Sequence, residues 1–257
     1  FDTGATNRLG RVDDGNAPTD YDEDETERKI TIAAKLAFAE WNRKLINLLD
    51  TPGFGNFIQE ARGALRVTDS AIVVIDAVSG VMVQTEKAWG YAEEFQLPRL
   101  IVVNRMDRDT ASFERSLESI QGRLGRMCAP IQIPLGEEKG FKGVVDLVQM
   151  KAYVYQTDGS GKFTESEIPA DAAGRAAEYR EKLVEAVAES DEKLMEKFFE
   201  SGSLTNDEVI AGLKIQVSDA KIYPVLYTSA TTNVGIQPLL NSILNLLPDA
   251  TARGTVT

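Results

Sequence analysis

The sequence of 257 residues contains no histidine and a single cysteine, Cys128. The absence of histidine excludes acid–base catalysis by imidazole and metal sites with histidine ligands. One cysteine excludes a disulfide within this chain and is compatible with a reducing cytoplasm, where we expect the protein to act. No apolar run approaches the roughly 18 residues that a membrane span needs. We therefore expect no membrane partner.

Basic residues are also scarce relative to acidic ones. The sequence has 28 lysines and arginines against 40 aspartates and glutamates, which gives a net charge of −12. We therefore expect no nonspecific binding to nucleic acid, although a local patch could still contact RNA. Hydrophobic residues make up 43% of the sequence, which is typical of a globular protein with one large or two modest domains.

The first part of the sequence is polar and begins with Phe1 rather than Met, without a signal-peptide pattern. This beginning indicates an excised piece of a longer protein. Residues 1–29 are rich in turn formers, and residues 20–27 hold six acidic side chains. Such a composition predicts a solvated, mobile loop.

Two strand-like runs follow this loop. Residues 33–41 and 44–49 are separated by a two-residue turn, and they predict a β-hairpin that ends at Asp50. Asp50 opens the motif Asp50-Thr51-Pro52-Gly53, in which a strand ends in a carboxylate and turns through glycine. The carboxylate can hold Mg²⁺, and the glycine N–H can approach a phosphate closely. Our hypothesis is that this motif senses the terminal phosphate of a nucleotide.

Downstream of this motif, short apolar runs alternate with amphipathic helical stripes. The runs predict buried strands at 70–76, 100–104 and 222–227, and the stripes predict helices at 56–67, 84–95, 112–124 and 236–247. This alternation predicts an α/β fold with a mostly parallel sheet and helices on both faces. Asp50, Asn104 and Ser229 lie at or just past strand ends, where such sheets bind ligands, so we expect one shared site.

The alternation of predicted strands and helices changes between Cys128 and Ala220. A crossover helix needs roughly 30 residues, whereas about 90 are available. We predict strands within 131–135 and 144–155, a further hairpin over 153–168, and helices at 171–188, 193–200 and 206–217. The domain prediction is a core of residues 1–130 and 221–257, with an inserted α+β subdomain at 131–220. Residues 249–257 are expected to be a linker.

A second chemical motif is Asn104-Arg105-Met106-Asp107. An acidic side chain can accept both the N1–H and N2–H donors of guanine, and an asparagine can brace the loop. Ser229-Ala230 follows the last predicted strand, where small residues would let backbone N–H groups reach O6 of guanine. Each motif is weak by itself, and a chance loop is the alternative; their shared position at strand ends favours base recognition.

Thr31 is a candidate metal ligand at the end of the polar loop. Its hydroxyl could bind Mg²⁺ only while the terminal phosphate is present, which would make residues 1–32 a switch segment. The alternative is an ordinary strand residue. Together with Asp50, it completes the predicted set of metal ligands.

Several strings together resemble the GTP-binding domain of translation elongation factor G or of a paralogue in that family. Glu27–Ile32 is similar to the end of its first switch, ERGITI, and residues 50–53 match its second-switch DTPG. Residues 104–107 are similar to its NKMD, and 229–230 to its SA. Strings in the insertion (LGE from Leu135, FKGVVD from Phe141 and MKAY from Met150) resemble its extra subdomain, which elongation factor Tu lacks.

The resemblance implies a P-loop GTPase that binds GTP or GDP with Mg²⁺ and couples hydrolysis to movement of tRNA and mRNA. It implies the ribosome as partner, through ribosomal RNA and the stalk protein. The nucleotide-binding residues that it implies are Asp50, Thr51, Pro52, Gly53, Asn104, Arg105, Asp107, Ser229 and Ala230.

Three positions depart from the family pattern. The phosphate loop GxxxxGK[ST] is absent, and Gly161-Lys162-Phe163 is the nearest string. We expect that loop upstream of Phe1, so the piece alone should bind nucleotide poorly and be inactive. Phe54 stands where the family has the histidine that positions the attacking water, so no catalytic residue is predicted. Lys29 replaces a glycine, which should restrict the switch.

These departures leave alternative functions open. The chain could belong to a hydrolysing translational GTPase whose water is oriented by the ribosome or another group. It could instead belong to a weakly hydrolysing or non-hydrolysing paralogue that uses GTP as a conformational latch on the ribosome, which Phe54 motivates. A structural α/β domain without nucleotide would require all the motifs to coincide by chance.

Overall fold

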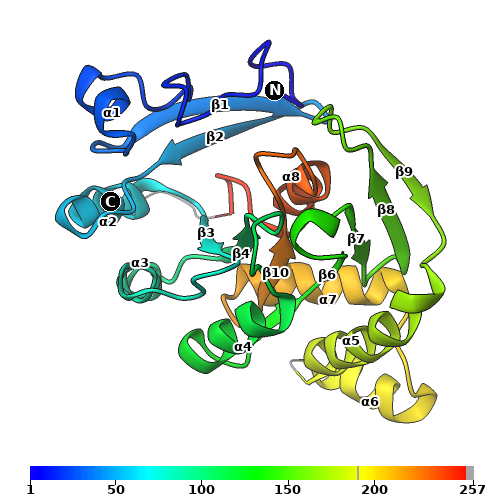
Figure 1. Ribbon diagram of the computed structural model, residues 1–257. Helices are drawn as coiled ribbons and strands as arrows, with labels where there is room; N and C mark the ends of the chain where they lie inside the picture. Colours follow the sequence, from blue (N-terminus) through cyan, green and yellow to red (C-terminus); the bar gives the residue numbers. More distant parts are fainter. Residues whose placement is uncertain (190, 253–257) are drawn as a thin grey trace. The chain divides into compact units, whose positions relative to one another are not determined.

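The computed structural model describes residues 1–189 and 191–252 (Figure 1). The chain forms two compact units. The first unit contains residues 1–71 and 83–97, and the second contains residues 72–82 and the described residues from 98 onward. Among the described residues, no helix combines the length and the apolar character that a membrane crossing requires.

The first unit is built on a hairpin. Strands β1 (Lys35–Trp41) and β2 (Lys44–Asp50) pair antiparallel along their whole length, with Lys35 opposite Asp50. Asn42 and Arg43 form the turn with φ values of 47° and 62°, as a two-residue turn between twisted strands requires. The predicted hairpin is therefore confirmed. The same unit contains the 3-10 turn η1 (Gly55–Phe57) and helices α2 (Ile58–Val67) and α3 (Val83–Glu94).

The prediction that residues 1–29 form a mobile loop is wrong for one part of it. Helix α1 (Glu23–Arg28) lies inside the acidic run. The N–H of Asp22 donates to Glu25 Oε2 at 3.4 Å. Three acidic side chains in the first turn also stabilise the helix through their interaction with the positive end of its dipole. Lys29 ends the helix at φ 57°, a left-handed conformation that suits glycine better.

The second unit contains the parallel sheet, in the order β3-β4-β10-β5. Its strands are β3 (Ala71–Asp76), β4 (Arg99–Asn104), β5 (Cys128–Pro130) and β10 (Tyr223–Tyr227). β10 runs parallel to both β4 and β5. Such strands are covered on both faces, which explains why their sequences are nearly continuous apolar runs.

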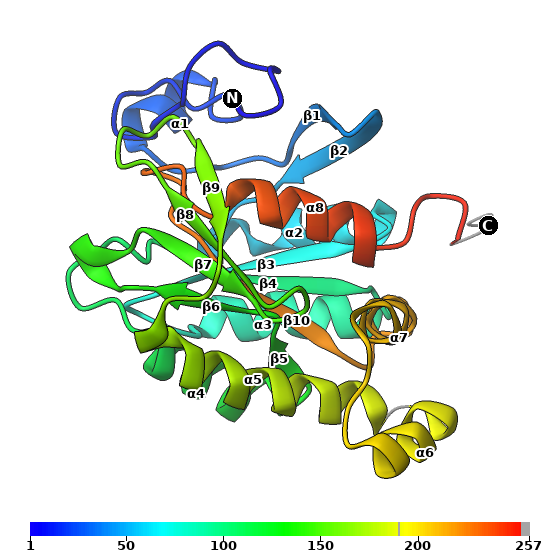
Figure 2. The same ribbon diagram turned by 90° about the vertical axis from the view of Figure 1, so that its right-hand side faces the viewer.

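Helices cover the two faces of this sheet within the second unit. Helix α8 (Ile236–Leu246) lies on one face, and helices α4 (Phe113–Leu124) and α5 (Ala170–Ala188) lie on the other (Figures 1 and 2). The predicted α/β class with a mostly parallel sheet and flanking helices is confirmed. Strand β5 was not predicted.

An antiparallel sheet, β6-β7-β8-β9, belongs to the same compact unit. Its elements are β6 (Gln132–Leu135), the turn η2 (Glu138–Gly140), β7 (Gly143–Asp146), β8 (Lys151–Tyr155) and β9 (Phe163–Ser166). Helices α6 (Glu192–Ser201) and α7 (Asn206–Ser218) complete the segment (Figure 2). The limits of the inserted subdomain at 131 and 220 stay a prediction. Residues 253–257 of the predicted core and linker lie outside the described residues.

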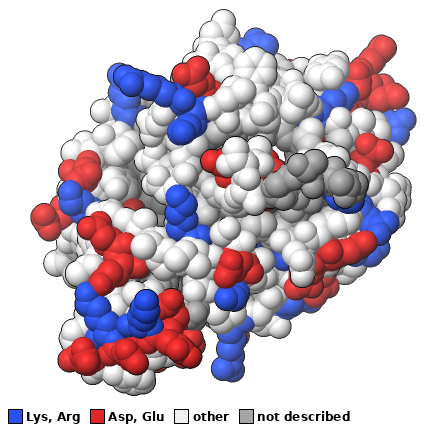
Figure 3. Space-filling view, turned by 180° about the vertical axis from the view of Figure 1, so that it is seen from behind, with Lys and Arg blue, Asp and Glu red and all other residues white. Residues whose placement is uncertain are grey.

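Acidic and basic side chains are interspersed on the molecular face of Figure 3. Because opposite charges alternate there, this face does not provide the continuous positive field that attracts a phosphate backbone.

Candidate functional site

The ends of two neighbouring parallel strands are joined through Asn104. This residue ends β4, and its side-chain oxygen Oδ1 accepts a hydrogen bond from the backbone N–H of Ala230 at 2.9 Å. The Thr228 hydroxyl lies 3.4 Å from the same oxygen. β10 ends at Tyr227, so both partners belong to the loop that follows it. Asn104 therefore braces two loops against each other at the carboxyl edge of the sheet.

Asp107 is held by the same second loop. The Ser229 hydroxyl donates to Asp107 Oδ1 at 2.6 Å, and the Ser229 oxygen accepts from the N–H of Thr232 at 3.2 Å. Ser229 is fully buried. A carboxylate has about four acceptor positions, so this bond fixes the orientation of Asp107 and leaves capacity for a ligand. The structure thus brings together Asn104, Asp107, Ser229 and Ala230, whereas the expectation that Asp50 shares their site stays a prediction.

Arg105 points to a third strand end. Its guanidinium NH1 lies 3.1 Å from Asp76 Oδ2, and Asp76 is the last residue of β3. Burial raises the pKa of Asp76, but N–H donors from Ser79 and Val78 and the Arg105 guanidinium outweigh it and hold the pKa below its ordinary value. Asp76 was not predicted as a site residue. Its only sequence signal is an acidic residue at the end of an apolar run.

The two predicted metal ligands in the first unit, Asp50 and Thr31, each form a hydrogen bond with a residue of the polar loop. The Thr19 hydroxyl donates to Asp50 Oδ2 at 2.5 Å, and the Thr31 hydroxyl donates to Asp20 Oδ1 at 2.8 Å. Thr31 and Asp50 are therefore linked through the consecutive residues Thr19 and Asp20. Sequence reasoning missed both linking residues, because a Thr-Asp pair in a polar loop carries no distinctive signal.

The donors around Asp50 suit magnesium in kind. Carboxylate and hydroxyl oxygens are hard ligands, and Mg²⁺ usually keeps several waters while binding one or two protein carboxylates. The described residues contain no group of three or more His, Cys, Asp or Glu that could hold a metal by themselves. Asp50 could thus contribute one carboxylate to a magnesium ion whose other ligands come from elsewhere, and its role as a metal ligand stays a prediction.

Glu25 fastens the polar loop to the first strand. It is 1% exposed, and its Oε1 accepts from the N–H groups of Ile32 at 2.9 Å and Ala33 at 3.1 Å. Lys35 Nζ lies 3.3 Å from Glu25 Oε2 and also pairs with Asp22. Burial raises the pKa of Glu25, but these N–H donors and Lys35 lower it below its ordinary value of 4.5.

Removal of the Glu25 carboxylate is expected to destabilise this loop. Glu25→Ala should lower the free energy of unfolding by about 1–3 kcal/mol at pH 7, because the half-buried N–H groups of Ile32 and Ala33 lose their acceptor. The folded-state pKa is depressed, so this contribution is present above pH 4.5 and is lost as the pH falls through the folded pKa. Urea unfolding of both proteins at several pH values measures this difference. Glu27→Ala, on the exposed side of the same helix, is the control; an equal loss there would contradict the prediction.

The segment after Asp50 lies outside regular secondary structure. Phe54 directly precedes η1, accepts a backbone hydrogen bond from the N–H of Phe57 at 2.9 Å, and is 58% exposed. A Cβ added at Gly53 would meet nothing within 4 Å. The folded chain itself therefore does not require glycine at this position. The predicted roles of Thr51, Pro52 and Gly53 stay predictions.

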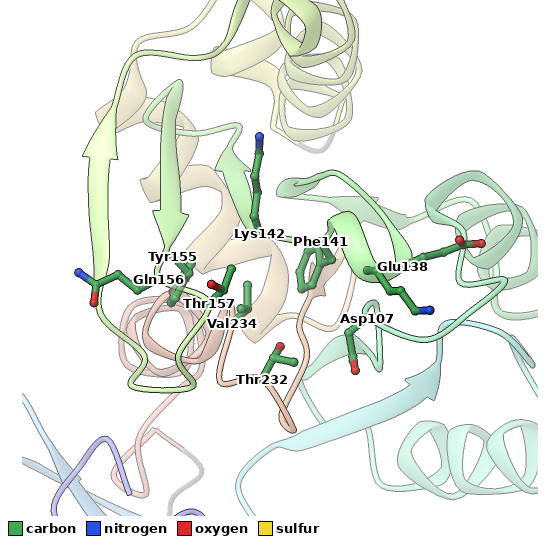
Figure 4. Close-up of a pocket in the computed structure, with 10 residues that line it drawn as sticks. Asp107, Glu138, Phe141, Lys142, Tyr155, Gln156, Thr157, Thr232 and Val234 are labelled. Atoms are coloured by element: carbon green, nitrogen blue, oxygen red, sulfur yellow. The ribbon is translucent and has the colours of Figure 1, made fainter.

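A cavity of about 260 Å³ lies beside Asp107 in the second unit (Figure 4). Thr232 and Val234 line it from the loop after β10, whereas Phe141 and Tyr155 line it from the antiparallel sheet. The loops that follow β4 and β10 and the antiparallel sheet thus share one concave surface.

Comparison with known proteins places this architecture in a family. Residues 1–249 match the elongation factor Tu GTP-binding domain. A crystal structure of a protein from Thermus thermophilus is similar, with 36% sequence identity and a TM-score of 0.90. The match covers 98% of this chain and 37% of that chain, so the present chain spans little more than a third of its relative. This chain belongs to the elongation factor Tu GTP-binding domain family and forms the G domain of a translational GTPase.

Proposed function

We propose that this G domain belongs to an elongation factor G-type protein that couples GTP hydrolysis to movement of tRNA and mRNA on the ribosome. The observation that carries the nucleotide part is the joining of Asn104, Asp107 and Ser229 at one sheet edge. Asp107 would accept the two N–H donors of guanine, and the N–H of Ala230 lies in the loop expected to face O6. Adenine offers no such pair of donors.

The residues proposed to bind phosphate and metal belong to the first unit. Asp50 and Thr31 would hold Mg²⁺, with Gly53 as an N–H donor to the terminal phosphate. When bound, Mg²⁺ would neutralise part of the negative charge of the phosphates. Thr19 engages one oxygen of Asp50, and the Thr31 hydroxyl donates to Asp20, so both metal-ligand candidates keep oxygen lone pairs for a cation.

The resemblance in the extra sheet favours elongation factor G over elongation factor Tu. The strings LGE, FKGVVD and MKAY fall on β6, β7 and β8 and on their connecting turns. The proposed partners are therefore ribosomal RNA and the ribosomal stalk protein, and the proposed location is the cytoplasm.

A second candidate function is a GTP-dependent latch on the ribosome with weak or no hydrolysis. Phe54 favours it, because a phenyl ring can neither donate a hydrogen bond to water nor accept a proton from it. Both candidates require guanine nucleotide binding, and they differ in turnover on the ribosome.

Binding to the full-length protein tests the shared part of the proposal. We expect GDP and GTP to displace a fluorescent guanine nucleotide, and ATP to compete at least about 100-fold more weakly, because Asp107 selects a pair of donors. Removal of Mg²⁺ with EDTA should weaken GTP binding. Equal competition by ATP, or no binding of either nucleotide, would refute the proposal. Multiple-turnover GTP hydrolysis with ribosomes then separates the translocase from the latch.

A further inference from the structure

The turn η2 of the antiparallel sheet lies directly on the predicted base-recognition loop. The backbone N–H of Glu138 donates to the carbonyl of Met106 at 2.9 Å. Met106 is fully buried, and in the sequence it directly precedes Asp107. Movement of this turn would therefore be transmitted to the backbone next to Asp107.

Two carboxylates of the same turn hold the rest of that loop. Glu138 Oε1 accepts from the N–H of Thr110 at 2.9 Å, and Glu137 Oε1 accepts from the N–H of Phe113 at 2.6 Å. Phe113 is the first residue of α4, where N–H groups lack helical partners and negative charge is favoured. The loop from Asn104 to Phe113 is thus fastened at three backbone positions.

The fastened loop contains strained backbone. Arg105 and Thr110 adopt φ values of 66° and 68°, in the left-handed region that non-glycine residues rarely occupy. Such conformations persist only where surrounding contacts determine them. The bonds from Glu137 and Glu138 are contacts of that kind.

The turn that provides these bonds is itself closed tightly. Gly136 has φ 77°, and a Cβ on it would lie 2.1 Å from the carbonyl oxygen of Gly140. The N–H of Lys142 donates to the carbonyl of Leu135 at 3.0 Å across the base of the turn. The base of the turn is therefore closed by contacts within the antiparallel sheet.

The second turn of that sheet contacts both the loop after β10 and the first turn of helix α8. Gln237 Nε2 donates to the carbonyl of Gly161 at 3.0 Å, and the Tyr155 hydroxyl donates to Gln237 Oε1 at 2.9 Å. The Asn233 side chain lies 3.4 Å from the carbonyl of Gly159. The next residue, Val234, exchanges two backbone hydrogen bonds with Ser229, so this contact reaches the residue that orients Asp107.

We propose that the turns 136–142 and 156–162 form a clamp that positions both guanine-recognition loops, with Glu137 and Glu138 as positioning residues for Asp107. Figure 4 shows Glu138 near Asp107 on one side of the cavity, and Tyr155 and Gln156 on the other. The clamp makes the antiparallel sheet part of base selection. The inference rests on the proposed function, because its ligand is a guanine nucleotide.

The test compares GDP with inosine diphosphate, which lacks the N2 amino group, in the full-length protein. We expect Glu138→Ala to weaken GDP binding about 10-fold and to weaken inosine diphosphate less, because a displaced Asp107 loses its bond to N2–H. Glu138→Gln keeps an acceptor for the Thr110 N–H and should restore most of the wild-type ratio. Glu137→Ala is a second variant at an independent anchor and should shift the ratio in the same direction.

Glu167→Ala is the control, because Glu167 is exposed and directly follows β9, outside both turns; it should leave the affinities for GDP and inosine diphosphate unchanged. Amide hydrogen exchange at Thr110 and Phe113 reports the clamp without nucleotide and should accelerate in Glu138→Ala and Glu137→Ala respectively. Wild-type GDP binding with an unchanged GDP-to-inosine ratio in both alanine variants would overturn the clamp alone. A wild-type protein that binds no GDP would overturn the proposed function and the clamp with it.

Discussion

Replacement of Asp107 by asparagine is expected to weaken GDP binding by at least about 100-fold and to create binding of xanthosine diphosphate. Two hydrogen bonds to a charged acceptor contribute about 1.5–3 kcal/mol each, and their loss accounts for a change of this size. The side chains have the same shape, so the fold should be preserved.

The direction of this change follows from the hydrogen-bonding groups. The Ser229 hydroxyl donates to Asp107 Oδ1, and the amide oxygen of Asp107→Asn can accept the same bond. Its NH₂ group would then face the N–H donors of guanine, which repels that base. Xanthine has a carbonyl at position 2, so the same NH₂ group can donate to it. The variant should therefore exchange one selectivity for another rather than only lose affinity.

Equilibrium competition with GDP and xanthosine diphosphate, measured on the full-length protein, gives both affinities. Asp109→Asn is a matched control, because Asp109 lies two residues away and its side chain is 79% exposed. Its ion pair with Lys139 is long, with 3.9 Å between Asp109 Oδ1 and Lys139 Nζ. We expect no change in that control. An Asp107→Asn protein with wild-type GDP affinity would exclude Asp107 from base recognition.

The sheet and the base-site cluster could be predicted because both depend on short-range pattern and topology. β4 and β10 are mostly buried, so their sequences are largely apolar, and polar residues stand at the end of β4 and just after β10. Once these two strands are neighbours and parallel, their carboxyl ends meet at the same edge. Asn104 and Ser229 are then close together without any knowledge of side-chain contacts.

The elements that escaped prediction are those determined by distant partners. β5 has three residues and ends in Pro130, which no strand pattern would indicate, and it exists because Cys128 and Pro130 pair with β10. Helix α1 lies in an acidic run whose composition predicts solvation. Its Glu25 is buried because Lys35 and two backbone N–H groups from beyond the helix surround it.

Side-chain contacts across long sequence separations were equally hidden. The bonds Thr19–Asp50 and Arg105–Asp76 each join residues about 30 positions apart. The turn at Glu138 contacts Met106 although its sequence resembles only an acidic, glycine-flanked loop. Such contacts depend on how whole elements pack, and a periodic pattern contains no information about that packing.

Replacement of Phe54 by histidine is expected to increase ribosome-stimulated GTP hydrolysis by the full-length protein on the order of 100-fold. The resemblance implies a water-positioning histidine at this position, and a positioned acid–base group contributes about 10²–10⁴-fold to a rate. Phe54 has φ −78° and ψ 137°, ordinary extended values that histidine adopts equally well. Its side chain is 58% exposed, so the substitution removes little packing.

The increase should appear in the turnover rate and not in nucleotide affinity. Asn104 and Asp107 are proposed to bind the base, and neither is altered, so the dissociation constant for GDP should stay at its wild-type value. Phe54→Leu is the matched control, because leucine replaces the ring without adding a group that can hydrogen-bond to water; its rate should equal that of the wild type.

Multiple-turnover phosphate release with and without ribosomes separates the two candidate functions. A low wild-type rate that rises in Phe54→His identifies position 54 as the limiting feature and supports a latch that has lost its water-positioning group. A wild-type rate that is already high would eliminate the latch, and an unchanged rate in Phe54→His would assign water positioning to the ribosome or another residue. These outcomes therefore decide whether the side chain at position 54 limits hydrolysis.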